Sequence, residues 1–130
     1  MNVSIPFTSQ SACLLLTNLF VPEEINLIEE PDFYQETKLD VNEECSIYGE
    51  VEKIWVEENS MGNIWVKFAN NNFTASNKAI EKMNGRYLLK FKINYFILFY
   101  YILLLFRFFA KRAINAFLVP ESFYDNYVPK

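Results

Sequence analysis

The sequence predicts one α+β domain whose elements follow the order β-α-β-β-α-β, the ferredoxin-like arrangement. Three observations lead to this fold class: two segments with helical spacing of apolar residues, four short β-type segments, and a hairpin signal between the middle two. The chain has 130 residues, enough for one domain with a sizeable core. We expect residues 1–11 to form an N-terminal tail and residues 12–127 to form the domain. An apolar insertion at about 88–108 precedes the last strand.

The first part of the domain is expected to be a strand, an acidic loop and a helix. Cys13–Asn18 is a short apolar run typical of a buried strand, and Phe20–Pro31 is the loop. From Phe33 to Tyr48 the apolar positions follow the four-and-three spacing of one helical face. Asp32 is placed to cap the start of this helix, and Gly49 to end it.

The middle of the domain is predicted to be a β-hairpin. Val51–Val56 is its first strand, Glu57–Gly62 its turn and Asn63–Phe68 its second strand. Strict alternation would give the first strand one face with Val51, Lys53 and Trp55, and another with Glu52, Ile54 and Val56.

The last part of the domain is predicted to be a helix, a strand and a tail. Asn71 or Thr74 can cap the helix, which Asn84–Gly85 ends. Ala113–Val119 is the last strand, halted by Pro120. Two helices on one face would leave the other sheet face open for binding, although Ser122–Tyr127 is expected to fold over the sheet.

Composition excludes several classes of enzyme. His is absent, which removes Ser-His-Asp triads, HExxH zinc sites and His general bases. Only two cysteines are present, Cys13 and Cys45, and both fall on positions expected to be buried. No nucleophile–base pair or metal-ligand set can be named. We therefore expect no catalytic residues, no metal and no cofactor. No secretory signal is recognised, which favours an intracellular protein.

The charge is divided between two parts of the chain. Residues 23–59 carry thirteen acids and two bases, whereas residues 60–130 carry three acids and ten bases, for a net charge of −4. Such a charge distribution gives the molecule a dipolar field. The acidic part is therefore suited to a basic partner, even though a run of acids is most often a solvated face.

The third strand carries part of the fingerprint of the RNA recognition motif. In MGNIWVKF (61–68), Gly62, Trp65, Val66 and Phe68 fit that pattern, while Met61 and Asn63 replace its basic and first aromatic residues. The first strand has Leu where RNA-stacking members usually have an aromatic. Stacking is worth about 1–3 kcal/mol per base, so these losses argue against ordinary single-strand RNA readout.

One subclass of this motif matches more closely. LLLTNLF (14–20), NEECSIYGEVEKIWVEENSMGNIWVKF (42–68), MNGRY (83–87) and FAKRAINAFLVPESFY (109–124) resemble the U2 auxiliary factor homology motif (UHM). The most similar members are the C-terminal domains of CAPER-type splicing factors. The resemblance implies an RNA-recognition-motif fold that binds peptides in pre-mRNA splicing, in the nucleus.

The resemblance also implies a binding mode. A UHM captures a Trp from a basic, disordered peptide of a spliceosome protein between its two helices. The acidic helix positions that pair with the Lys and Arg of the peptide match Asp40 and Glu44, with Glu36 and Glu43 adding to the negative field. The i, i+4 spacing of the first two places them on one helical face, offset from the core stripe.

The family pocket is completed by an Arg-x-Phe loop, and here the chain departs from the pattern. The matching Arg86 and Phe109 are separated by the apolar stretch, in which Phe91 is a poorer substitute. Seventeen of the 21 residues in 88–108 are apolar or aromatic. The stretch consists almost wholly of residue types that AT-rich codons encode. A retained intron, a gene-model error and a real insertion all remain open.

Two alternative functions remain open. An RNA-binding motif would contact single-stranded RNA through Trp65, Lys67, Lys111 and Arg112, with weak and non-specific phosphate contacts. A small membrane-anchored protein would use residues 93–106, but this run of 14 residues is shorter than the roughly 20 that a spanning helix needs. Peptide is therefore the first expected partner, RNA the second, and a membrane the least favoured.

Overall fold

The computed structural model describes residues 5, 6, 8–85 and 114–130. The described residues contain a four-stranded antiparallel sheet with the spatial order β2-β3-β1-β4. The elements in chain order are β1 (Cys13–Thr17), η1 (Pro22–Glu24), α1 (Phe33–Ser46), β2 (Val51–Val56), β3 (Ile64–Phe68), η2 (Ala69–Asn71), α2 (Phe73–Met83), β4 (Asn115–Val119) and α4 (Glu121–Tyr127). The predicted β-α-β-β-α-β order of the RNA-recognition-motif fold is confirmed. The apolar stretch 88–108 lies outside the described residues.

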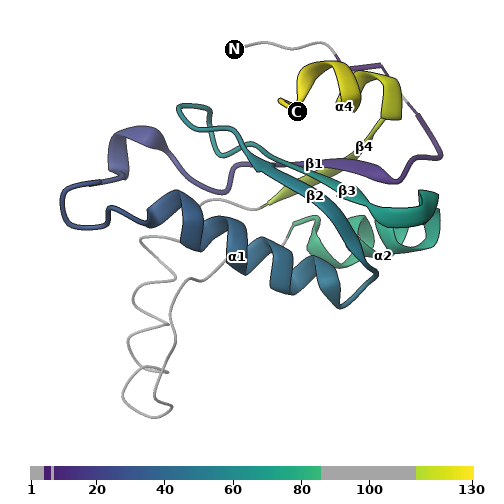
Figure 1. Ribbon diagram of the computed structural model, residues 1–130, viewed down its shortest axis with the longest axis horizontal. Helices are drawn as coiled ribbons and strands as arrows, with labels where there is room; N and C mark the ends of the chain where they lie inside the picture. Colours follow the sequence, from purple (N-terminus) through teal and green to yellow (C-terminus); the bar gives the residue numbers. More distant parts are fainter. Residues whose placement is uncertain (1–4, 7, 86–113) are drawn as a thin grey trace.

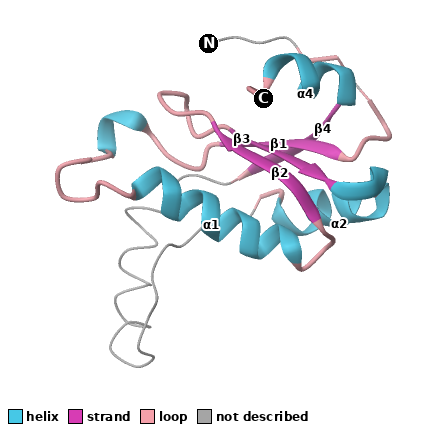
Figure 2. Cartoon of the chain, in the orientation of Figure 1, coloured by secondary structure: helices cyan, strands magenta, loops and turns pink. Residues whose placement is uncertain are grey.

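The domain has three layers. Helices α1 and α2 lie on one face of the sheet and α4 lies across the other, as Figures 1 and 2 show. The main core fills the space between the sheet and α1 and α2, and a smaller second cluster fills the space under α4. The folding of the tail over the sheet is therefore confirmed, and the expectation of an open second face is wrong.

Strand β1 is apolar at consecutive positions and does not alternate between apolar and polar residues. Leu14 and Leu16 point into the main core, whereas Cys13 and Leu15 point into the cluster under α4. All four side chains are at most 3% exposed. A strand covered on both faces needs apolar residues at every position, as the sequence shows here.

The predicted faces of β2 are wrong at its first two positions. A register shift separates Val51 from Lys53 in the pairing with β3. Val51 consequently packs against the main core, and the Glu52 carboxylate lies 3.5 Å from the ammonium nitrogen of Lys67 on β3. A bulge adds a residue to one strand and so reverses the alternation on one side of it. Beyond the bulge, Trp55 points to the α4 side.

The helix ends differ from the predictions by a few residues. Asp32 occupies the N-cap of α1 but makes no side-chain capping bond, and the helix ends at Ser46, before Gly49. The cap of α2 is Asn72, whose Oδ1 accepts a 3.0 Å hydrogen bond from the backbone N–H of Ala75. Asn71 has a φ of 50° in the turn η2, which is not the extended conformation of an N-cap.

The end of α2 is joined to the start of β4. Gly85, with a φ of 82°, donates its backbone N–H to the carbonyl of Ile114 at 2.7 Å. The Oδ1 of Asn84 accepts the backbone N–H of Ala116 at 3.1 Å. The residues on the two sides of segment 86–113 are therefore hydrogen-bonded neighbours.

Candidate functional site

The acidic residues proposed for peptide binding lie along one side of α1. The core stripe of this helix is Thr37, Val41 and Cys45, all buried. Asp40 and Glu44 each precede a stripe residue by one position, so they lie about 100° around the helix from it. Both are half-buried, which places them at the border between the core and the solvent.

Glu36 and Glu43 lie further out on the same helix and are exposed. The charged residues of α1 are these two glutamates, Asp40, Glu44 and Lys38. They give the helix a net charge of −3. Within the described residues, Glu36, Asp40 and Glu43 form no ion pair, and the ion pairs found there all involve Lys67. This side of α1 therefore keeps a negative field that can attract a cationic partner.

Glu44 is oriented by a neighbouring side chain. The hydroxyl of Tyr48 donates a 3.1 Å hydrogen bond to Oε1 of Glu44, one helical turn away. Tyr48 itself packs against the main core. A carboxylate held in this way loses less side-chain entropy when it pairs with a partner.

Arg86, Phe109 and Phe91, the poorer substitute for Phe109, lie outside the described residues, as do Lys111 and Arg112. Asp40, Glu44, Glu36 and Glu43 are the members of the predicted peptide site that the structure brings together.

Two of the residues predicted to contact RNA, Trp65 and Lys67, lie under α4. Trp65 is 1% exposed, and its ring centroid is 4.6 Å from that of Tyr127 and 6.1 Å from that of Phe123. Its Nε1–H donates a 2.9 Å hydrogen bond to Oε1 of Glu57. No ring face of Trp65 is open to a base while α4 is docked.

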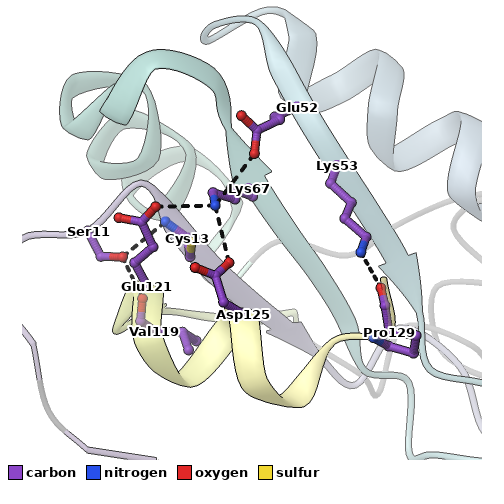
Figure 3. A network of polar contacts seen from close by, with 9 residues as sticks. All are labelled: Ser11, Cys13, Glu52, Lys53, Lys67, Val119, Glu121, Asp125 and Pro129. Atoms are coloured by element: carbon purple, nitrogen blue, oxygen red, sulfur yellow. Dashed lines mark hydrogen bonds and ion pairs between the residues drawn. The ribbon is translucent and has the colours of Figure 1, made fainter.

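Lys67 is held by three carboxylates in the same cluster. Its ammonium nitrogen lies 3.5 Å from Glu52, 3.2 Å from Glu121 and 3.2 Å from Asp125 (Figure 3). Burial lowers the pKa of Lys67, but hydrogen bonds and charge interactions with Asp125 and Glu121 outweigh it and raise the pKa. Two of the three acids belong to α4, so the helix neutralises the cation that would meet a phosphate.

Figure 3 also shows two hydrogen bonds made by residues on either side of α4. Lys53 on β2 donates to the backbone carbonyl of Pro129, and Ser11 donates to that of Val119. Tyr127 donates its hydroxyl to Oε2 of Glu57 at 3.3 Å. Sequence reasoning missed this network, although the i, i+4 pairs Glu121/Asp125 and Phe123/Tyr127 signal a helix with one acidic and one aromatic side.

The cysteines are unsuited to nucleophilic chemistry. Burial is the main cause that raises the pKa of Cys13 and of Cys45 to about 12 each. Both thiols are therefore protonated at neutral pH, and the thiolate is the reactive form. Within the described residues, no three His, Cys, Asp or Glu side chains are grouped so that they could hold a metal ion.

No helix in the described part of the chain is long and apolar enough to cross a membrane, and residues 93–106 lie outside that part. A groove of about 410 Å³ lies beside β4. Its lining contains no charged side chain and consists of Ile5, Pro6, Thr8, Asn77, Ile80, Ala116, Phe117 and Leu118.

No family model matches the chain. Among solved structures, the chain is similar to Pes4 RRM3, with a TM-score of 0.40 and 13% sequence identity over 85% of this chain and 93% of that one. The fold assignment rests on the strand order and helix placement described above.

Proposed function

We propose that this domain is a non-catalytic interaction module that binds a basic, Trp-containing peptide of a spliceosome protein through α1. The proposal includes a role in pre-mRNA splicing and a nuclear location. The observation that carries it is the acidic side of α1, where Asp40 and Glu44 lie together at the border of the core. A cationic peptide would pair with these carboxylates while its Trp enters between α1 and α2.

The covered sheet supports this proposal over RNA binding. Trp65 is 1% exposed and Lys67 is paired with three carboxylates, so the usual RNA-binding face has neither a free stacking ring nor a free cation at these positions. The acidic side of α1, in contrast, would repel a nucleic-acid backbone. A protein partner with basic residues fits the charge that the domain presents.

The test is a calorimetric titration with a synthetic peptide that has one Trp flanked by Lys and Arg. We expect Asp40→Lys/Glu44→Lys to weaken binding by about tenfold or more, since each reversed charge replaces attraction by repulsion. Asp40→Asn/Glu44→Gln keeps the side-chain shapes and should show an intermediate loss.

The matched control makes the same change of charge at the two ends of β2. Glu50 and Glu58 are both exposed, and Glu50→Lys/Glu58→Lys should retain most of the affinity of the wild type. Equal affinity of the wild type and both α1 variants would reject the proposed function.

A further inference from the structure

The solvent side of α1 carries two large aliphatic side chains in line with an acid. Leu39 is 56% exposed and Ile47 is 72% exposed. Glu43 lies between them at i, i+4 spacing from each, so the three follow one line along the helix. Ile47 is the C-cap residue and keeps a helical backbone, with φ −64° and ψ −32°. This line is on the opposite side of α1 from the buried Val41.

The surroundings of this line indicate the charge of what would cover it. Glu36 and Asp40 flank it on one side, and neither forms an ion pair within the part of the chain that the structure describes. Burying Leu39 or Ile47 against an acidic segment would bring like charges together. A basic segment with aliphatic side chains complements both the charge and the apolar surface.

We propose that the partner peptide carries, beside its Trp, an extended segment of the form aliphatic–x–basic–x–aliphatic that lies along Leu39, Glu43 and Ile47. This inference rests on the proposed function and specifies the partner of the same helix. The basic residue pairs with Glu43, and the two aliphatic residues cover Leu39 and Ile47.

The spacing supports an extended partner. A helix rises 1.5 Å per residue, so Leu39 and Ile47 are about 12 Å apart along α1, with Glu43 halfway. In an extended chain alternate side chains point the same way and are about 6.6 Å apart, so the first and fifth residues are about 13 Å apart. A short basic peptide is also a poor helix former in water, which favours this conformation.

The test compares three peptides with the wild type. The core peptide has one Trp flanked by Lys and Arg, the patterned peptide adds Leu-Thr-Arg-Thr-Ile, and the shifted peptide adds Leu-Arg-Thr-Thr-Ile. We expect the patterned peptide to bind about tenfold more tightly than the core, and the shifted peptide to gain less because its Arg points away from Glu43. Equal affinity of the core and patterned peptides would overturn the inference.

Substitutions in α1 identify where the gain arises. Leu39→Gln/Ile47→Gln keeps good helix formers and should remove the gain while leaving core-peptide affinity unchanged. Met61→Gln is the control, because Met61 is 58% exposed in the β2–β3 turn, and the gain should persist there. A gain that survives in Leu39→Gln/Ile47→Gln would contradict the inference.

The proposed function and this inference can fail separately. Core-peptide binding that is lost in Asp40→Lys/Glu44→Lys, with no gain from the added segment, would keep the function and reject the inference. If the core peptide does not bind, the inference is tested by titrating the domain with the added segment Leu-Thr-Arg-Thr-Ile alone. NMR shifts of α1 signals that disappear in Leu39→Gln/Ile47→Gln support the inference, and the absence of such shifts in the wild type rejects it. Helix formation by the bound peptide, seen by circular dichroism, would reject the extended conformation.

Discussion

Tyr127 is the side chain whose removal should most clearly release α4 from the sheet. Its ring centroid lies 4.6 Å from that of Trp65, 5.9 Å from that of Trp55 and 5.8 Å from that of Phe123. Its hydroxyl donates to the buried carboxylate of Glu57 at 3.3 Å. We predict that Tyr127→Ala undocks α4 and exposes Trp65.

The size of this effect follows from the burial of the ring. Replacing a fully buried aromatic by Ala costs about 3–5 kcal/mol, and Tyr127 is half-buried, which reduces the packing loss to about 2 kcal/mol. The lost hydrogen bond to Glu57 adds about 1 kcal/mol. Tyr127→Ala should therefore lower the free energy of unfolding by about 3 kcal/mol, and Tyr127→Phe by about 1 kcal/mol.

Two readouts separate undocking from general destabilisation. Urea unfolding followed by tryptophan emission measures the stability, and iodide quenching in the absence of urea measures the access of solvent to Trp55 and Trp65. Quenching should rise in Tyr127→Ala and stay near the wild-type value in Tyr127→Phe. Asn126→Ala changes an exposed neighbour on α4 and is the control. If Tyr127→Ala matches Asn126→Ala in both measurements, the proposed docking of α4 is refuted.

Three further predictions concern the fold. A Cβ on Gly62, which has a φ of 80°, would lie 2.3 Å from the backbone nitrogen of Leu19, so Gly62→Ala should cost about 3 kcal/mol or more in urea unfolding. Gly85→Ala, at a φ of 82° but with nothing within 4 Å, should cost only about 1 kcal/mol; equal costs would contradict the close approach. Asn72→Ala should lower stability by about 1 kcal/mol through loss of the α2 cap, whereas Thr74→Ala should change it little, as thermal unfolding would show. Burial raises the pKa of Cys13 and Cys45 from 9.0 to about 12. Between pH 9 and pH 12 the unfolded chain therefore loses each thiol proton more readily than the folded chain does. The contribution of each thiol to the free energy of unfolding should be complete below pH 9 and should fall by about 1.4 kcal/mol per pH unit up to pH 12. Cys45→Ala should weaken this pH dependence, and an unfolding midpoint that stays constant from pH 8 to 11 would contradict it.

Local pattern was sufficient to predict most of the fold. The spacing of Thr37, Val41 and Cys45 specifies the buried side of α1, and the short apolar runs specify the strands. The bulge exchanges the sheet faces to which Val51 and Glu52 point. It has no signal in the local sequence, because it depends on the register between β2 and β3. The cap of α2 was misplaced because left-handed Asn70 and Asn71 move the N-cap to Asn72, so that the helix starts at Phe73.

The covering of the second sheet face by α4 could be predicted only in part. A tail over the sheet at 122–127 is expected from the sequence, but not the ion pairs of Glu121 and Asp125 with Lys67, more than fifty residues earlier in the chain. Contacts at that separation depend on the tertiary fold and leave no periodic trace. Asp40 and Glu44, in contrast, lie on one helix, so their spacing alone placed them side by side.

The central claim is that α1, and not the sheet, receives the partner. It is tested most directly by NMR of the ¹⁵N-labelled domain titrated with the basic Trp-containing peptide. We predict that the backbone amide signals around Asp40 and Glu44 shift, while the indole signals of Trp55 and Trp65 do not. Shifts of both indole signals, with the amide signals of α1 unchanged, would contradict the account.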